Sequence, residues 1–146
     1  MYTSEKSTKL TLAVTYIFAF VLAGLMVFAY PIARDALGPG NRTAYLSAVI
    51  AFYICCPAGW YALYNIKKIL VNVLSDTVFT KETVTLLRIL SWCCVFVAAV
   101  SFVTMFLCHI FFVFTIGAAF MALILRVLKN VLARAVEIKE ENELTI

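Results

Sequence analysis

The sequence predicts an all-α integral membrane protein in which four spanning helices form a bundle. Of its 146 residues, 64% are hydrophobic and 14% are charged, whereas soluble domains have roughly 45–50% apolar and about 25% charged residues. The mean hydropathy is +1.00. A soluble core could not hide this much apolar surface, so lipid must solvate part of the chain. The length is that of a single domain, residues 1–146.

A helix needs about 20 apolar residues to cross a bilayer. Apolar stretches of this length therefore predict where the spans lie. The first stretch is longer than the core of a signal peptide, so we interpret it as a retained span. It ends at Tyr30, and we expect an outer loop from Pro31 to about Thr43. The last two spans share one tract that is too long for a single helix, and we place a turn near Cys108–Phe112. The predicted spans are residues 10–30, 45–66, 89–108 and 111–128.

The positive charges predict the orientation. With the N-terminus inside, ten of the twelve Lys and Arg residues are cytoplasmic, and only Arg34 and Arg42 are outside. Membrane proteins carry such an excess on their cytoplasmic side. We therefore expect both termini, the loop 67–88 and the tail 129–146 to lie in the cytoplasm.

The second, third and fourth helices are expected to extend beyond the bilayer as a short cytoplasmic stalk. Thr80 is suited to cap the third helix, with Glu82 complementing the helix dipole in its first turn. Two apolar stripes at helical spacing should pack on each other rather than face water. They are Ile66, Ile69, Leu70, Val73 and Leu74 in the second helix, and Leu125, Leu128, Leu132 and Ala135 in the fourth.

Neither catalysis nor conduction is indicated. Apart from Arg126 at the cytoplasmic end of the fourth span, the first, second and fourth spans lack charged residues, which transport through lipid usually requires. No catalytic motif is present. The five cysteines lie in apolar runs without metal-ligand spacing, so we expect free thiols, no metal and no cofactor. Pro57, with Gly59 nearby, predicts a kink that is either static packing or a hinge.

The cytoplasmic face is the candidate docking region, because the outer loops are too small to recognise a large ligand. Its basic residues suit either anionic lipid head groups or a protein partner. The tail offers charge followed by apolar anchors, although it could equally fold back on the stalk. The candidate docking residues are Thr80, Glu82, Arg88, Glu140, Glu141, Asn142, Glu143, Leu144, Thr145 and Ile146.

Two segments carry a family resemblance. The run Val78-Phe79-Thr80-Lys81-Glu82-Thr83-Val84-Thr85-Leu86-Leu87-Arg88, followed by Trp92, resembles the pattern Phe-Thr-x-Glu-Asn-Val-x-x-Leu-Arg. Lys129-Asn130-Val131 and the ending Lys139-Glu140-Glu141-Asn142-Glu143-Leu144-Thr145-Ile146 resemble Lys-Asn-Val and Lys-x-Glu-Asn-Asp-Leu-Thr-Ile. Both patterns belong to the bacterial domain-of-unknown-function family 2975, and the likeness covers nearly the whole chain. Thr83 and Glu143 depart from it, standing where Asn and Asp are usual.

The resemblance implies a multi-pass protein of the bacterial plasma membrane. Members of that family are often accompanied by a small helix-turn-helix regulator, which implies a membrane component that binds or controls a transcription factor. The protein itself would not contact nucleic acid. Two rival functions stay open, namely an immunity or stress-protection protein and a small transporter subunit working as a homo-oligomer.

Overall fold

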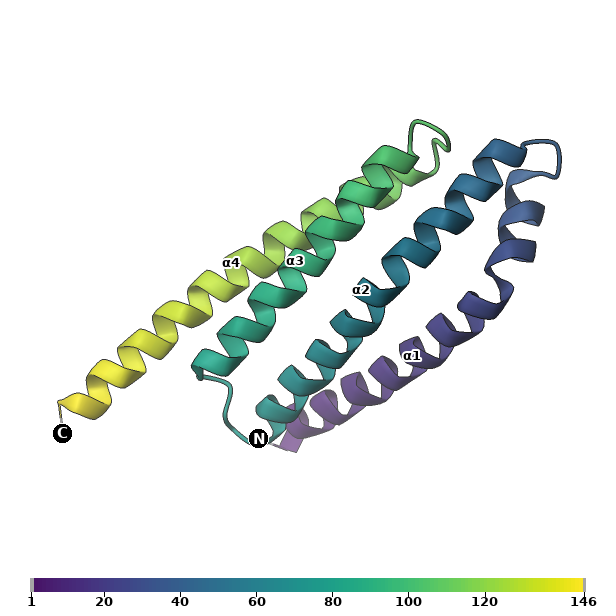
Figure 1. Cartoon of the computed structure of the whole chain (residues 1–146). Coiled ribbons are helices and arrows are strands. Elements are labelled where there is room, and N and C mark those ends of the chain that lie inside the picture. The colour runs from purple at the N-terminus through teal and green to yellow at the C-terminus, as the bar shows by residue number, and fades with distance from the viewer. Residues whose placement is uncertain (1, 146) are drawn as a thin grey trace.

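The computed structural model describes residues 2–145, with side chains from Lys6 onward, and consists of four α-helices. They are α1 (Tyr2–Leu37), α2 (Arg42–Leu74), α3 (Lys81–Thr104) and α4 (Phe111–Leu144) (Figure 1). Each is long and apolar enough to cross a membrane, and no strand occurs in the described chain. The predicted all-α class with four spans is therefore confirmed, and the chain is a multi-pass membrane protein.

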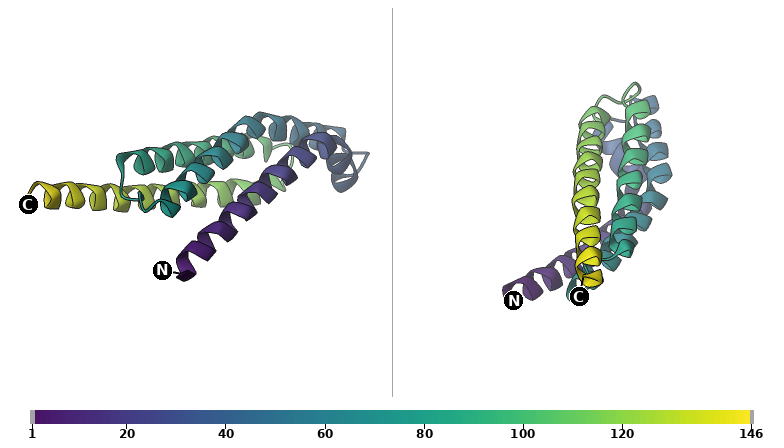
Figure 2. Two further views of the ribbon diagram at one scale, coloured as in Figure 1. Left: turned by 90° about the horizontal axis from the view of Figure 1, so that it is seen from below. Right: turned by 90° about the vertical axis from the view of Figure 1, so that its left-hand side faces the viewer.

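The helices stand in chain order, so the bundle is open rather than closed. α2 packs against α1 and α3, whereas α4 packs against α3 alone. α1 and α4 therefore form the two edges, and the N-terminal half of α1 diverges from the other helices (Figure 2). Because the number of helices is even, both chain ends lie at the same end of the bundle as the α2–α3 loop (Figure 1).

The α2–α3 connection is built by local capping. α2 ends in a Schellman-type turn, in which the Thr77 amide donates to the Asn72 carbonyl (2.9 Å) and Asp76 adopts a positive φ of 53°. The Thr80 side chain then accepts a hydrogen bond from the Thr83 amide (3.4 Å), and Glu82 lies in the first turn of α3. The predicted cap of the third helix is thus confirmed.

The first connection differs from the predicted loop. α1 does not end at Pro31 but continues through it to Leu37, and its last part turns away from the preceding helix axis (Figure 1). A proline inside a helix removes one hydrogen bond and bends the helix, but the following residues Ile32–Leu37 contain no further breaker. The helix stops before Gly38, whose φ of +82° favours glycine.

The connection between α3 and α4 spans residues 105–110. It begins three residues before the predicted turn at Cys108–Phe112, and Phe111 and Phe112 already belong to α4. The exposed His109 lies within it. The turn is short because successive backbone bonds, such as Cys108 amide to Thr104 carbonyl (2.9 Å), reverse the chain.

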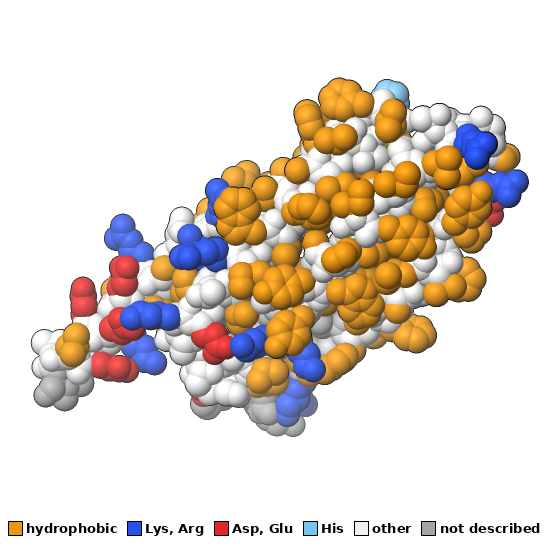
Figure 3. All heavy atoms as spheres, viewed as in Figure 1, with side chains coloured by type: hydrophobic (Ala, Val, Ile, Leu, Met, Phe, Trp, Pro, Cys, Tyr) orange, Lys and Arg blue, Asp and Glu red, His pale blue; other side chains and the backbone are white. Residues whose placement is uncertain are grey.

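Apolar side chains form a band across the middle of the face seen in Figure 3, and charged side chains gather at its two ends. α4 contains 34 residues and so measures about 51 Å, well beyond the roughly 30 Å of a hydrocarbon core. Exposed aromatic and aliphatic side chains in the band, such as Phe20 (82%) and Val113 (71%), suit contact with lipid.

Candidate functional site

The start of α3 is fixed to the end of α2 by a partly buried polar cluster. Asn72 Nδ2 donates a hydrogen bond to Thr83 Oγ1 (3.3 Å), and the Thr80 and Thr83 hydroxyl oxygens lie 3.1 Å apart. Thr83 is only 1% exposed. The family pattern that this segment resembles has Asn at this position, and the Thr83 hydroxyl supplies the polar group here instead. It also holds Thr80 in place.

Two ion pairs bring candidate docking residues to one end of the bundle. Lys68 Nζ lies 2.6 Å from Glu82 Oε1, and Lys81 Nζ lies 2.9 Å from Glu140 Oε1. The hydrogen bond that Lys68 donates to the Glu82 carboxylate raises the pKa of Lys68 above its ordinary value, and the carboxylate charge adds to the effect. Both pairs are largely exposed, so they orient the helices more than they stabilise them. Thr80, Glu82 and Glu140 thus lie at the same end of the bundle, where Glu82 pairs with α2 and Glu140 pairs with α3.

The tail continues α4 as a helix and does not fold back. Glu140 lies opposite the first residue of α3, so the residues after it project past that helix (Figure 1). They are Glu141, Asn142, Glu143, Leu144 and Thr145. Leu144 is 87% exposed, and Thr145 Oγ1 donates to the Glu141 carbonyl (2.6 Å) at the end of the helix. Ile146 lies outside the described residues.

The predicted stalk is wrong in one respect, since the stripes of α2 and α4 do not pack on each other. Each helix contacts α3, which lies between them. Val136, absent from the predicted stripe, is 5% exposed against α3, whereas the predicted Leu128 is 48% exposed. The packed face of α4 is rotated from the predicted one because its neighbour is α3. Leu70, Val73, Leu132 and Ala135 are half-buried, and Leu74 is exposed.

Because α4 packs through a different face from the predicted one, an apolar stripe on its outer side is left uncovered. Val131 and Ile138 are 61% and 58% exposed, and they continue the line of Leu128 toward the C-terminus. We call Leu128, Val131 and Ile138 the outer stripe. Exposed hydrophobic side chains that lie together mark surfaces that bind other proteins or membranes.

Arg88 lies away from the tail, in a polar pocket between α3 and α4. The pocket has a volume of about 320 Å³. Arg126 stacks over Trp92, with its guanidinium carbon 5.4 Å from the ring centroid. Sequence reasoning singled out Arg88 but missed the pocket. Its residues stand at equal spacing on both helices, but that spacing does not reveal the register that brings them together. The lining residues are Arg88, Ser91, Trp92, Arg126, Lys129 and Asn130.

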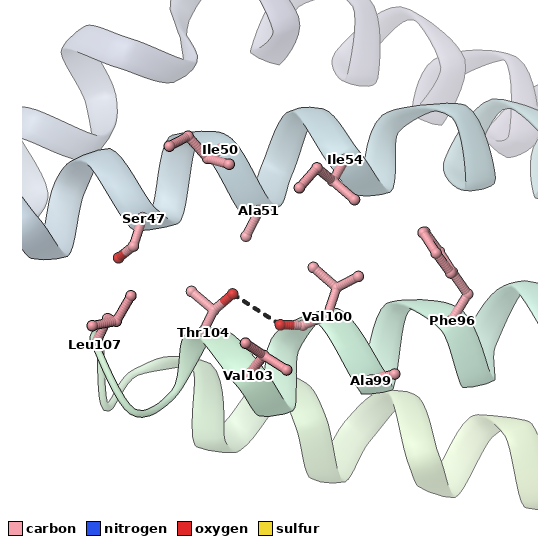
Figure 4. Close-up of a pocket in the computed structure, with 10 residues that line it drawn as sticks. All are labelled: Ser47, Ile50, Ala51, Ile54, Phe96, Ala99, Val100, Val103, Thr104 and Leu107. Carbon is pink, nitrogen blue, oxygen red and sulfur yellow. Dashed lines mark hydrogen bonds between the residues drawn. The ribbon is translucent and has the colours of Figure 1, made fainter.

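A second hollow, apolar in character, lies between α2 and α3 within the apolar band. It measures about 470 Å³, and side chains such as Ile50, Ile54 and Val100 point into it (Figure 4). Its hydroxyls are engaged within their own helices, as where Thr104 Oγ1 donates to the Val100 carbonyl (2.8 Å). The groove therefore offers surroundings of the kind that acyl chains occupy.

The predicted hinge residues lie within an uninterrupted α2. Pro57 is exposed, and a Cβ added at Gly59 would lie 3.4 Å from Leu22 Cδ2, an ordinary contact. Whether α2 moves about Pro57 stays a prediction. All five cysteines are free thiols.

Comparison with known proteins gives one match. The family described as Protein of unknown function (DUF2975) matches residues 29–146, which include the polar pocket, the outer stripe and the tail. None of the curated proteins and none of the solved structures matches this chain.

Proposed function

The chain belongs to the family described as Protein of unknown function (DUF2975), and from this premise we propose a non-enzymatic, membrane-tethered regulator. Its cytoplasmic face binds a small helix-turn-helix transcription factor and holds it at the bacterial plasma membrane. Both termini lie in the cytoplasm, as the placement of ten of twelve positive charges favours. The choice of partner follows from the association of such regulators with the family.

The extension of α4 is the observation that carries this proposal. Arg126 and Lys129 mark the end of its apolar span, and the stretch from Lys129 to Leu144 extends about 24 Å further at the helical rise. Val131, Ile138 and Leu144 are 61%, 58% and 87% exposed there. Apolar surface in water costs about 25 cal/mol per Å², so a partner that covers these residues is stabilised by their burial.

Charge on the same extension favours a basic partner. Glu140, Glu141 and Glu143 are exposed near its end, and acidic side chains gather there (Figure 3). An anionic membrane surface repels them, so the extension projects into the cytoplasm. DNA-binding proteins carry basic surfaces, and opposite charge speeds their encounter with an acidic segment.

Crosslinking from the outer stripe tests the proposal. A photoreactive residue at Val131 or Ile138 should crosslink to a small helix-turn-helix protein. The same residue at Ala133, which is half-buried, is the matched control and should crosslink weakly. Equal crosslinking from all three positions would mean that the outer stripe is not the docking surface.

Removing residues 142–146 provides the functional test. The Lys81–Glu140 pair and the packing of Val136 remain in the truncated chain, so membrane abundance should equal that of wild type. The activity of a promoter reporter for the transcription factor should then no longer be controlled by this protein. An unchanged reporter at equal abundance would refute the docking role of the tail. Lost protection against a toxin or stress with an unchanged reporter would favour the immunity function instead.

A further inference from the structure

We propose that the polar pocket between α3 and α4 binds the phosphodiester of an anionic phospholipid head group at the cytoplasmic membrane interface. The site needs no protein partner and is independent of the proposed regulation. Three cations, two neutral polar side chains and one indole line it. Its residues occupy matching positions on the two helices, with Arg88, Ser91 and Trp92 facing Arg126, Lys129 and Asn130.

The spacing explains why these six side chains converge. On each helix they stand at positions i, i+3 and i+4, which lie on one face. The two faces are held together where Ser91 Oγ donates a hydrogen bond to the Ala122 carbonyl of α4 (3.2 Å). Ser91 is only 2% exposed. This contact fixes the register in which Arg88 approaches the basic turn of α4.

Charge balance calls for an anion. Within the described chain, no carboxylate lies within salt-bridge distance of Arg88, Arg126 or Lys129. Like charges that share a small site repel one another, and an anion between them turns repulsion into attraction. Arginine presents a planar fork that matches phosphate oxygens. A volume of about 320 Å³ is at the lower end of small-ligand sites.

Position favours a lipid over a free anion. The pocket lies where the apolar spans of α3 and α4 end, and Trp92 is of the type enriched at that depth. One turn closer to the middle of the membrane, Phe96 and Leu123 are 45% and 63% exposed. A bound phosphodiester would therefore have an apolar surface beside it on which its acyl chains can lie. Inorganic phosphate would gain nothing from that surface.

Head-group competition in bilayers of defined composition tests the proposal. The full chain is placed in nanodiscs that contain phosphatidylglycerol and phosphatidylcholine with identical acyl chains, and retained lipids are counted by native mass spectrometry. Wild type should retain phosphatidylglycerol preferentially. The double variant Arg126→Gln/Lys129→Gln should lose about tenfold of that preference, because charge-assisted bonds to phosphate are removed.

A matched control separates the site from diffuse attraction. Arg134→Gln/Lys139→Gln removes the same charge from exposed positions of the same helix and should keep the wild-type preference. Asn130→Asp, which places a carboxylate in the pocket and removes no cation, should lose it, so the test does not depend on one variant folding. Equal preference in wild type, the double variant and Asn130→Asp would overturn the site.

Titration with sodium phosphate distinguishes the two sources of the anion. In nanodiscs of phosphatidylcholine alone, wild type should show no saturable phosphate binding, read from the fluorescence of Trp92 in a Trp60→Phe background. Arg126 stacks on Trp92, so a bound anion alters that signal. Saturable binding of inorganic phosphate, lost in the double variant, would overturn the lipid assignment in favour of a soluble anion.

Discussion

Truncating Val136 to alanine should release the extension of α4 from α3, whereas the same change at Val131 should not. The two residues have the same side chain on the same helix, five positions apart, but are 5% and 61% exposed. Val136 loses two buried methyl groups, worth about 0.8 kcal/mol each. Alanine has a higher helix propensity than valine, which stabilises the helix by about 0.5 kcal/mol. The net loss is about 1 kcal/mol, or about a fivefold shift in the equilibrium between the packed and released states of the α4 extension on α3.

At Val131 the two contributions nearly cancel, because less than half of the side chain is covered. The difference between the two variants is measured by hydrogen exchange of residues 132–144, followed by mass spectrometry in nanodiscs. Val136→Ala should speed exchange there about fivefold, and Val131→Ala should leave it within twofold. Equal acceleration by both would mean that α4 does not dock through the face containing Val136. A larger effect at Val131 would mean that α4 packs against α3 through the face containing Val131.

Four further outcomes are expected. Reporter fusions after Glu143 and near Gly40 should give cytoplasmic and external signals respectively, and an external signal at Glu143 would contradict the even number of spans. Alkylation without reduction should modify all five cysteines once the protein is denatured, and a disulfide-linked peptide in the mass spectrum would contradict the free thiols. Thr80→Ala should lower thermal stability by about 1 kcal/mol in circular dichroism, with Thr80→Ser as the control near wild type. Asp76→Gly should raise it by up to about 1 kcal/mol, because glycine accepts the left-handed conformation of this residue (φ 53°) without strain; a fall would contradict that reasoning.

Sequence alone predicts those features of the fold that depend on local chemistry. Spans follow from apolar length, and the Thr80 cap follows from a side chain placed before a polar first turn. Pro31 shows where such reasoning fails. Read as a loop signal, it instead lies within α1, since the next residues form a helix as far as Gly38. A proline weakens one turn of a helix, and its neighbours decide whether the helix ends.

Features that depend on the neighbouring helix could not be predicted in the same way. Periodicity placed Leu128 in the packed stripe of α4, but that helix meets only α3, and Val136 is buried in its place. The polar pocket is a second example. Both sets of three lining residues stand in the sequence, yet they form a site only in the register that the Ser91–Ala122 hydrogen bond records. The residue pattern of a single helix cannot predict how two helices align.

The two proposed binding surfaces of α4 are independent by geometry. Arg126, Lys129 and Asn130 line the pocket, and the outer stripe lies about 160° around the helix axis at about 100° per residue. A lipid head group and a protein partner can therefore bind at the same time. The pocket lies beside α3 at the bilayer edge, whereas the stripe runs outward to Ile138. Arg126→Gln/Lys129→Gln should then reduce retention of phosphatidylglycerol and leave crosslinking from Val131 unchanged. Loss of both signals together would mean that head-group binding positions α4 for its partner, and the two surfaces would then be coupled.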